Sequence, residues 1–390
     1  MASLKRHSTN RRCIQEQMIM SRALYFGGEG GEVFGGEGGE GGEGGEGGEG
    51  GERDTSIRPS QLMTRARLTS GDGIRGYWAD DGAPPDHLPN EPEVVEHWST
   101  AIRTRAYTTE LISGIVFDAR KLRQSVAVHY YDRDTKTECM LSCLTRPDPD
   151  DFQRQIQYLR NYAALRQERS AEIVSAASDI LAFFGMVSYL HHARTRRTLE
   201  LLRSVLNATI VIEHRVKHAL ACRRPVEYSP QVHPLIQTPG HGSLPSGHAT
   251  EAFVVAFVLS ELLKDAQDSN GRLNMNQDTV RIQLLRHAER IATNRTVAGL
   301  HFPVDSVAGM VLAQALSDYY LCRVGHRTRM NSKIFDGRGF EGDFHYQTVL
   351  DAVEKQGGTS SIKNGDEINF ESSSSNLLEY MWSAARDEWR

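Results

Sequence analysis

The sequence predicts an all-α fold, a bundle of helices, and two observations carry this prediction. Apolar residues recur every three or four positions in one segment after another, which is the period of a buried helix face. The connections between these segments are short and often contain proline or glycine, so neighbouring helices are expected to pack together. One helical domain is expected over residues 93–325, with a polar C-terminal tail over 326–390.

Residues 1–92 are expected to form a disordered N-terminal region. The stretch 27–52 is largely a Gly-Gly-Glu repeat, with too much glycine to hold a helix and too little apolar surface to build a core. We interpret the repeat as a tolerated expansion in preference to an acidic tether. The prolines of residues 72–92 predict an extended segment that leads into the folded domain.

The first helical segments precede the residues that carry chemistry. A helix face is expected over residues 95–106 and is expected to continue over 111–117. Residues 122–144 alternate partly between apolar and polar side chains, which predicts a short strand or an irregular stretch. Two further helices are predicted over 150–165 and 173–187.

Four helices complete the predicted domain. They cover residues 196–220, 249–263 and 280–294, and the last begins at Pro303, a residue suited to the first helical turn. The tail that follows is polar and is expected to pack peripherally or to stay mobile.

Composition limits the classes of partner. The 45 basic and 50 acidic residues give a formal net charge of -5, which argues against a nucleic-acid-binding surface. The five cysteines form no C-x-x-C pair, which favours reduced thiols inside a cell. No stretch reaches the roughly 18 apolar residues of a membrane span, and no apolar core follows the basic N-terminus. We therefore expect a soluble, cytoplasmic chain without an integral membrane segment, and leave a homo-oligomer open.

The central motif is Pro-Ser-Gly-His at residues 245–248, directly before the helix predicted over 249–263. A helix start presents unpaired backbone N–H groups and the positive end of the helix dipole, so it suits an oxyanion. Gly247 lets the backbone approach a ligand, Ser246 adds a hydroxyl group, and His248 titrates near neutral pH.

Further charged residues accompany this motif on both sides. Lys217 and Arg224 stand close to two helical turns apart, and the proline after Arg224 marks a helix end. Downstream come Arg295, His301 and Asp305. The four-residue step from His301 to Asp305 lets the carboxylate hold Nδ1–H of the imidazole. Together these groups predict a site for a tetrahedral oxyanion.

These motifs resemble those of the superfamily that joins type 2 phosphatidic acid phosphatases, bacterial acid phosphatases and vanadium-dependent haloperoxidases. The resemblance covers K-x6-R-P at residues 217–225, P-S-G-H at 245–248 and R-x5-H-x3-D at 295–305. One departure is Asn294, where the family usually has serine, at a position not expected to bind the anion. The resemblance implies a helical bundle of the acid phosphatase and vanadium haloperoxidase type.

The resemblance also implies roles for these residues. The predicted oxyanion-binding set is Lys217, Arg224, Ser246, Gly247 and Arg295, and the predicted catalytic set is His248, His301, Asp305 and Lys217. In a haloperoxidase, His301 would be the axial vanadium ligand of a vanadate cofactor, and hydrogen peroxide and halide would be the substrates. In a phosphatase, no cofactor is needed, and His301 would form a phosphohistidine with a phosphate ester.

Two further histidines favour the haloperoxidase interpretation. His241 occupies the position where the resemblance places histidine in bromoperoxidases, and His214 falls near the expected halide route. We therefore predict a vanadium-dependent haloperoxidase that oxidises bromide or iodide, with a soluble acid phosphatase as the alternative. An anion-binding module without catalysis is a third class. His214 with His218, or Cys139 with Cys143, could instead hold a metal ion, and both interpretations are less favoured.

Overall fold

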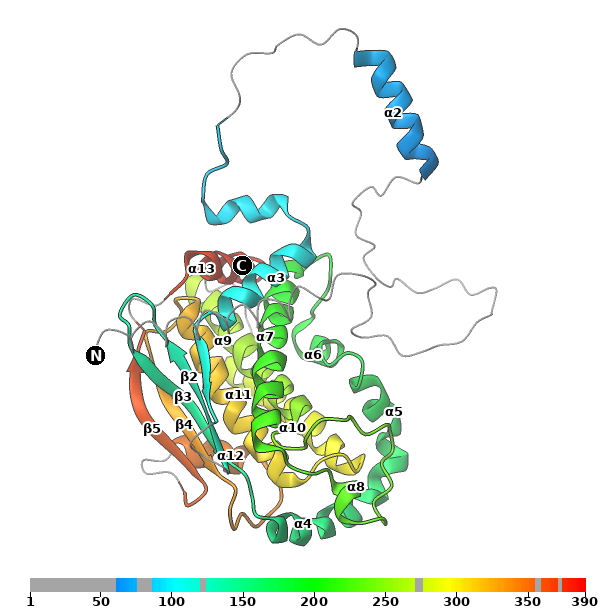
Figure 1. The fold of residues 1–390 in the computed structure, drawn as a ribbon, viewed down its shortest axis with the longest axis vertical. Coiled ribbons are helices and arrows are strands. Elements are labelled where there is room, and N and C mark those ends of the chain that lie inside the picture. Colours follow the sequence, from blue (N-terminus) through cyan, green and yellow to red (C-terminus); the bar gives the residue numbers. More distant parts are fainter. Residues whose placement is uncertain (1–60, 76–85, 120–123, 271–275, 355–358, 371–373) are drawn as a thin grey trace, which may run out of the picture. The chain divides into compact units, whose positions relative to one another are not determined.

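The computed structural model describes residues 61–75, 86–119, 124–270, 276–354, 359–370 and 374–390 (Figure 1). The Gly-Gly-Glu repeat and most of the region expected to be disordered lie outside these residues. Within that region, Gln61–Arg75 forms helix α2, whose described side chains are almost all exposed. A short 3₁₀ helix, η1, covers Pro92–His97.

Four long helices form the core of the fold. They are α7 (Arg196–Leu220), α9 (Gly247–Asn270), α10 (Gln277–Val297) and α11 (Pro303–Arg323), and the single-turn helix α8 (Pro225–Tyr228) lies between α7 and α9 in the chain. Helix α9 packs against α7, α10 and α11. Each long helix begins within three residues of its predicted start, and Pro303 occupies the first turn of α11.

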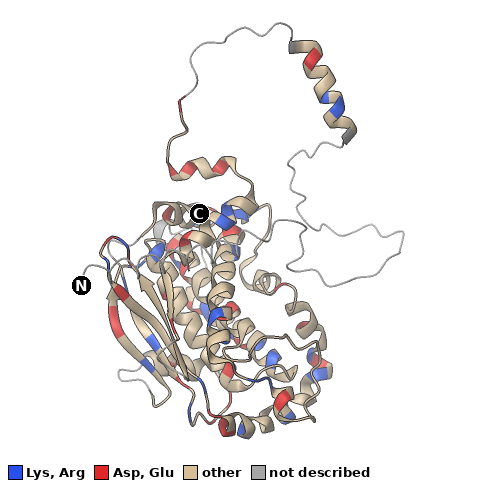
Figure 2. Cartoon of the chain, viewed as in Figure 1, with Lys and Arg blue, Asp and Glu red and all other residues tan. Residues whose placement is uncertain are grey.

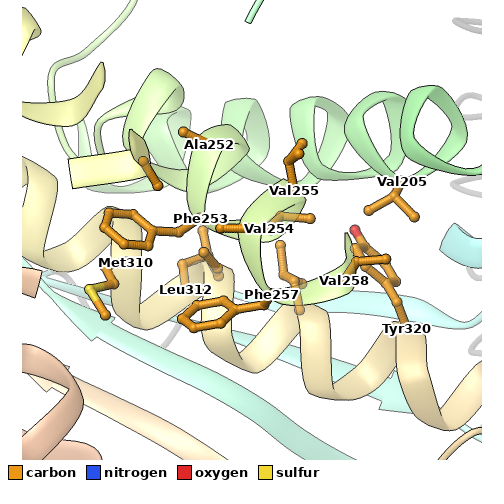
Figure 3. Close-up of a cluster of buried hydrophobic side chains, with 14 of the residues drawn as sticks. Val205, Ala252, Phe253, Val254, Val255, Phe257, Val258, Met310, Leu312 and Tyr320 are labelled. Carbon is orange, nitrogen blue, oxygen red and sulfur yellow. The ribbon is translucent and has the colours of Figure 1, made fainter. Parts of the chain in front are cut away.

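Helix α9 lies in the middle of this core because its sequence is apolar on nearly every side. All eight residues from Ala252 to Leu259 are buried. Figure 3 shows Phe253 and Phe257 of α9 beside Met310 and Leu312 of α11, with Val205 of α7 on another side. Truncating one such phenylalanine costs about 3–5 kcal/mol, so the core holds the start of α9 firmly in place.

The remaining helices surround this core and the sheet. The helix predicted over residues 95–117 ends earlier, at Ile112, because Gly114 takes a positive φ of 88° and the chain continues as a strand. The surrounding helices are α3 (Thr100–Ile112), α4 (Pro149–Tyr162), η2 (Ala163–Leu165), α5 (Arg166–Ala176), α6 (Leu181–Ser188), α12 (Tyr346–Glu354) and α13 (Asn376–Asp387).

The fold is helical as predicted, but all-α is too narrow a description because one side of the bundle carries a five-stranded sheet (Figure 1). Its strand order is β1-β2-β3-β4-β5, and only the β3–β4 pair is parallel. Helix α11 packs against β3 and β4, and α7 packs against β2. The strands are β1 (Ile115–Asp118), β2 (Ser125–Tyr131), β3 (Glu138–Thr145), β4 (Arg329–Asp336) and β5 (Ile362–Asn369).

Residues 326–390, expected as a polar tail, contribute two of these strands and two helices. Strand β5 pairs with β4 along Arg329 to Phe335 although it carries only two apolar side chains. Helix α13 packs on α7, α9 and α3, and its buried Trp382 donates from Nε1 to Asp265 of α9. The polar composition hid this order because backbone pairing holds β5 in the sheet, and a single amphipathic face holds α13.

Neither charged nor apolar residues are concentrated in one part of the described chain. Acidic and basic residues are interspersed over the helices and strands (Figure 2). Among the described helices, none alone has the length and apolar character of a membrane span, although one bent pair, residues 149–176 with Leu181–Ser188, meets the criteria of length and composition together.

Candidate functional site

The predicted oxyanion-binding side chains come from the ends of four helices, α7, α8, α9 and α10. Lys217 lies in the last turn of α7, and Arg224 directly precedes α8. Ser246 directly precedes α9, and Arg295 lies in the last turn of α10. All four side chains are buried. Helix ends therefore bring together cations that are far apart in the sequence.

His301 sits between α10 and α11, where Asp305 of the first turn of α11 orients it. Nδ1 of His301 lies 3.1 Å from Oδ2 of Asp305. The same Oδ2 accepts the backbone N–H of Phe302 at 3.0 Å, and the backbone oxygen of Asp305 accepts the N–H of Ser246 at 2.9 Å. Asp305 thus ties the imidazole of His301 to the Pro-Ser-Gly-His loop, as the sequence spacing predicts.

Arg224 determines the tautomer of His301. Its Nη1 lies 2.9 Å from Nε2 of His301 and donates to the backbone oxygen of Leu300 at 2.9 Å. A guanidinium can only donate, so Nε2 is the acceptor and the ring proton is on Nδ1, shared with Asp305. Burial, with Arg224 and Lys217, holds the pKa of His301 well below its usual range. The ring is therefore neutral, and its Nε2 carries a lone pair at the anion site.

Asp305 is fully buried. Burial raises the pKa of its carboxyl to about 7, against the opposing effects of the Phe302 N–H and Arg224. A cationic group bonded at Nε2 of His301 would favour the ionised carboxylate.

Several buried donors have no partner among the described residues. They are Nε and Nη1 of Arg295 and Oγ of Ser246, on side chains that are 4% and 0% exposed. A buried polar group without a hydrogen bond costs about 1–3 kcal/mol. Burial lowers the pKa of Arg295 to about 10, so the guanidinium is still charged at neutral pH. These donors fit a tetrahedral oxyanion, whether phosphate or vanadate.

Lys217 is held at the same loop. Its ammonium group donates to the backbone oxygen of Pro245, and its side chain is 1% exposed. Burial lowers its pKa, and the nearby Glu213 carboxyl opposes this effect. The predicted cation is therefore present beside the start of α9.

His248 is tied to a different helix. Its Nε2 lies 3.1 Å from the backbone oxygen of Ala176 at the end of α5. Because a carbonyl only accepts, Nε2 carries a proton and Nδ1 is the atom that gains or loses one. Burial and the charge of Arg295 hold the pKa of His248 well below its usual range. A bound dianion would raise that pKa.

His241 and His214 lie at an exposed edge of the site. Nδ1 of His241 lies 3.1 Å from Nη2 of Arg224, and its backbone oxygen accepts from Nε of Arg224 at 3.0 Å. The ring of His214 meets that of His241 edge to face, with centroids 4.9 Å apart. Burial and Lys217 lower the pKa of His241 to about 4, so the ring is neutral. His241 therefore supports Arg224, and His214 contacts only His241 among the predicted site residues in the described part of the chain.

Asn294 is hydrogen-bonded to helix α5. Its amide nitrogen donates to Oε2 of Glu172 at 3.0 Å, and its amide oxygen accepts from Nη1 of Arg169 at 3.2 Å. Both partners lie on α5, so Asn294 joins α10 to α5. The departure from serine leaves the anion-binding groups unchanged.

Sequence reasoning missed two carboxyl groups beside the central motif, the buried Glu213 and the half-buried Glu251. A Cβ added to Gly247 would lie 2.6 Å from Oε1 of Glu213 and 3.3 Å from Oε1 of Glu251. The spacing held a signal, since Glu213 stands one helical turn before Lys217 and Glu251 follows His248 by three residues. The sequence does not show which glutamates are removed from water, so it could not distinguish these two from glutamates on a solvated helix face.

The metal interpretations gain no support. No group of three or more histidine, cysteine or acidic side chains suited to a metal ion occurs among the described residues. Cys139 and Cys143 are both free thiols.

Residues 197–328 match the family model of the PAP2 superfamily. This segment runs from the start of α7 to just past α11, and it contains every predicted site residue from Lys217 to Asp305. No curated protein sequence matches the chain.

Proposed function

Because residues 197–328 belong to the PAP2 superfamily, whose members are phosphatases or haloperoxidases, we propose that this chain is an enzyme that hydrolyses phosphate esters through His301. The observation that carries the proposal is the neutral imidazole of His301. Its Nε2 acceptor lies beside Arg224, while Asp305 holds its Nδ1 proton. A nucleophile and the group that orients it are thus within hydrogen-bond reach.

Substrate binding uses the donors described above. The guanidinium groups of Arg295 and Arg224 and the ammonium of Lys217 offset the charge of a phosphate dianion. Ser246 Oγ and the N–H groups at the start of α9 donate to its oxygens. In the transition state, the same donors stabilise the negative charge on the three equatorial oxygens of the phosphoryl group.

In the first chemical step, the lone pair on Nε2 of His301 forms the N–P bond while the P–O bond to the alcohol breaks. The ring then carries a positive charge, which the Asp305 carboxylate stabilises. His248 gives its Nδ1 proton to the departing oxygen, so the product leaves as a neutral alcohol.

In the second step, His248 accepts a proton from water, and the resulting hydroxide oxygen forms a new P–O bond. The N–P bond breaks, its electron pair returns to Nε2 of His301, and inorganic phosphate leaves. His248 is again protonated, so the cycle closes without a cofactor.

Vanadate-dependent halide oxidation is the second candidate, and His241 favours it by its position beside Arg224. The unpartnered donors of Arg295 and Ser246 fit vanadate as well as phosphate. Lys217, Arg224, Ser246 and Arg295 would hold it, with His301 as the ligand. Bound vanadate would act as a Lewis acid toward hydrogen peroxide. We rank this candidate second because it needs a vanadate cofactor that ester hydrolysis does not need, and the contact of the neutral His241 ring supports Arg224 equally well in a phosphatase.

The two candidates are separated by the effect of vanadate on one purified preparation. We expect hydrolysis of p-nitrophenyl phosphate without added metal, and inhibition by vanadate, which mimics the five-coordinate transition state. Bromide or iodide oxidation that requires vanadate, together with absent ester hydrolysis, would establish the haloperoxidase instead.

A further inference from the structure

We propose that Glu213 and Glu251 form a carboxyl pair that takes up a proton when an oxyanion binds beside it. This inference deepens the proposed function and rests on its anion site. The pair lies where α7 and α9 meet, directly over Gly247 of the central motif.

The geometry places both carboxyl groups beside Gly247. Oε1 of Glu213 and Oε1 of Glu251 lie 2.6 Å and 3.3 Å from the position that a Cβ on Gly247 would occupy. Any side chain there would collide with Glu213. The glycine of the motif therefore makes room for a carboxyl group as well as for a ligand.

Glu213, the buried member of the pair, lacks the partners that a buried carboxylate needs, and Glu251 is half-buried. Oε2 of Glu213 is buried without a hydrogen-bond partner, and the side chain is 2% exposed. Among the described residues, neither carboxyl lies within 4.0 Å of a cationic nitrogen. Two adjacent carboxylates disfavour each other's ionised form, so at least one retains a proton more readily than an isolated group. Burial likewise raises the pKa of Glu213 to about 7 and that of Glu251 to about 8.

Unpartnered donors nearby show where the anion binds. Arg295 affects the ionisation of Glu251, and its Nε and Nη1 have no partner among the described residues. Lys217 acts on both carboxyls, and Ser246 is the direct neighbour of Gly247. The charged and titratable groups that act on the pair are Lys217 and His214 of α7, Arg224 before α8 and Arg295 of α10, and Glu213 in turn raises the pKa of Tyr320 on α11.

Charge balance explains why binding and protonation are linked. Three cations, Lys217, Arg224 and Arg295, meet three carboxyl groups, those of Glu213, Glu251 and Asp305. With all of them ionised the set is neutral, and the carboxylates repel an incoming dianion. A proton bound to the pair restores one positive charge and leaves a carboxyl O–H beside the ligand. The protein therefore takes up one proton for each dianion that it binds.

Sulfate is the probe because it is tetrahedral and remains a dianion throughout the working pH range, so any proton taken up comes to the protein. We would titrate the full chain with sulfate by calorimetry, in buffers of different ionisation enthalpy, at pH 6 and pH 8. At pH 8 we expect uptake approaching one proton per sulfate. At pH 6 we expect much less, once the uptake by His248, measured as the difference from His248→Gln, is subtracted. In the pH range where binding takes up a full proton, the affinity for sulfate should decrease about tenfold for each unit by which the pH is raised.

Paired variants identify the groups responsible. The double variant Glu213→Gln/Glu251→Gln should lose most of the uptake at pH 8 and bind sulfate nearly equally at both pH values. His248→Gln should retain the uptake at pH 8, as should Glu168→Gln, a change at an exposed carboxyl on α5. Uptake that persists in the double variant, or disappears in His248→Gln, would overturn the proposal.

The same preparations separate this inference from the proposed function. Ester hydrolysis by a wild-type protein that binds sulfate without proton uptake would overturn the carboxyl pair and leave the phosphatase standing. Proton-linked sulfate binding without ester hydrolysis would support the pair and count against the phosphatase. A protein that binds no sulfate at either pH would overturn the pair.

Discussion

Two buried arginines, Arg103 and Arg295, differ in what surrounds them. They are 3% and 4% exposed. Nε and Nη2 of Arg103 donate to the two carboxylate oxygens of Glu200 at 2.7 Å and 3.1 Å, and its Nη1 donates to the backbone oxygen of Trp98. Nε and Nη1 of Arg295 have no partner among the described residues. Burial alone thus marks neither arginine as functional, and the missing partner distinguishes Arg295.

Helix α7 shows the same contrast along its length. Glu200 in its first half accepts from both Arg103 and Arg197. Glu213 in its second half has a carboxylate oxygen without a partner in the described chain. One end of the helix therefore closes an ion-pair network that joins α3 to α7, and the other end leaves charges ready for a ligand.

The largest expected effect follows from removing the nucleophile. His301→Ala should lower phosphate-ester hydrolysis on the order of 10⁴-fold or more, since loss of a nucleophile abolishes its chemical step. Steady-state rates with p-nitrophenyl phosphate measure this, and circular dichroism checks that the helices are retained. Activity within tenfold of wild type would place the reacting atom elsewhere.

His248→Ala should cost about 10²–10⁴-fold, the usual contribution of a general acid and base. The pH profile gives a sharper test. Burial and Arg295 lower the pKa of His248, so its protonated fraction, and with it kcat/KM, should decrease as pH rises through that low pKa. The bound dianion raises the pKa, so the corresponding limb of kcat should lie at higher pH. A variant without His248 that retains both limbs would contradict this assignment.

Much of the site was predictable because its residues stand at fixed distances from helix ends. Lys217 and Arg224 bracket the end of α7, and His301 and Asp305 bracket the start of α11, so spacing together with the family resemblance indicated the site. The sheet was less predictable. The charged residues in β4 and β5 obscure strand alternation, and their pairing depends on backbone contacts between distant segments. Glu213 and Glu251 were missed because a helical glutamate resembles a solvated one until its burial is known.

The arginine comparison predicts opposite phenotypes. Arg295→Met should lower activity about 10²–10³-fold, as the loss of a transition-state donor does, and leave the melting temperature unchanged or raised. Arg103→Met should leave Glu200 with fewer partners and destabilise the fold by about 3–5 kcal/mol, while the folded fraction retains its rate constants. Thermal melts and kinetics on both variants measure this. A stability loss for Arg295→Met equal to that of Arg103→Met would remove the distinction.

The smallest effect concerns Gly247. Gly247→Ala places a Cβ 2.6 Å from Oε1 of Glu213, so the carboxyl group must move, and we expect KM to rise about tenfold with a smaller change in kcat. Adding Glu213→Ala should recover part of this loss by making room. Gly185→Ala is the matched control because its new Cβ would meet nothing closer than 3.7 Å. Equal losses in the single and double variants would show that the carboxyl is not the obstacle.

The most direct measurement of the central claim is to trap the covalent intermediate. Full-length protein would be mixed with excess p-nitrophenyl phosphate, quenched in alkali, in which phosphohistidine is stable, and digested for mass spectrometry. We predict a phosphoryl group on His301, greater labelling in a variant with slowed hydrolysis of the intermediate, and none in His301→Ala. Rapid ester hydrolysis with no phosphohistidine, or with the label on another residue, would contradict the assignment of His301 as the nucleophile.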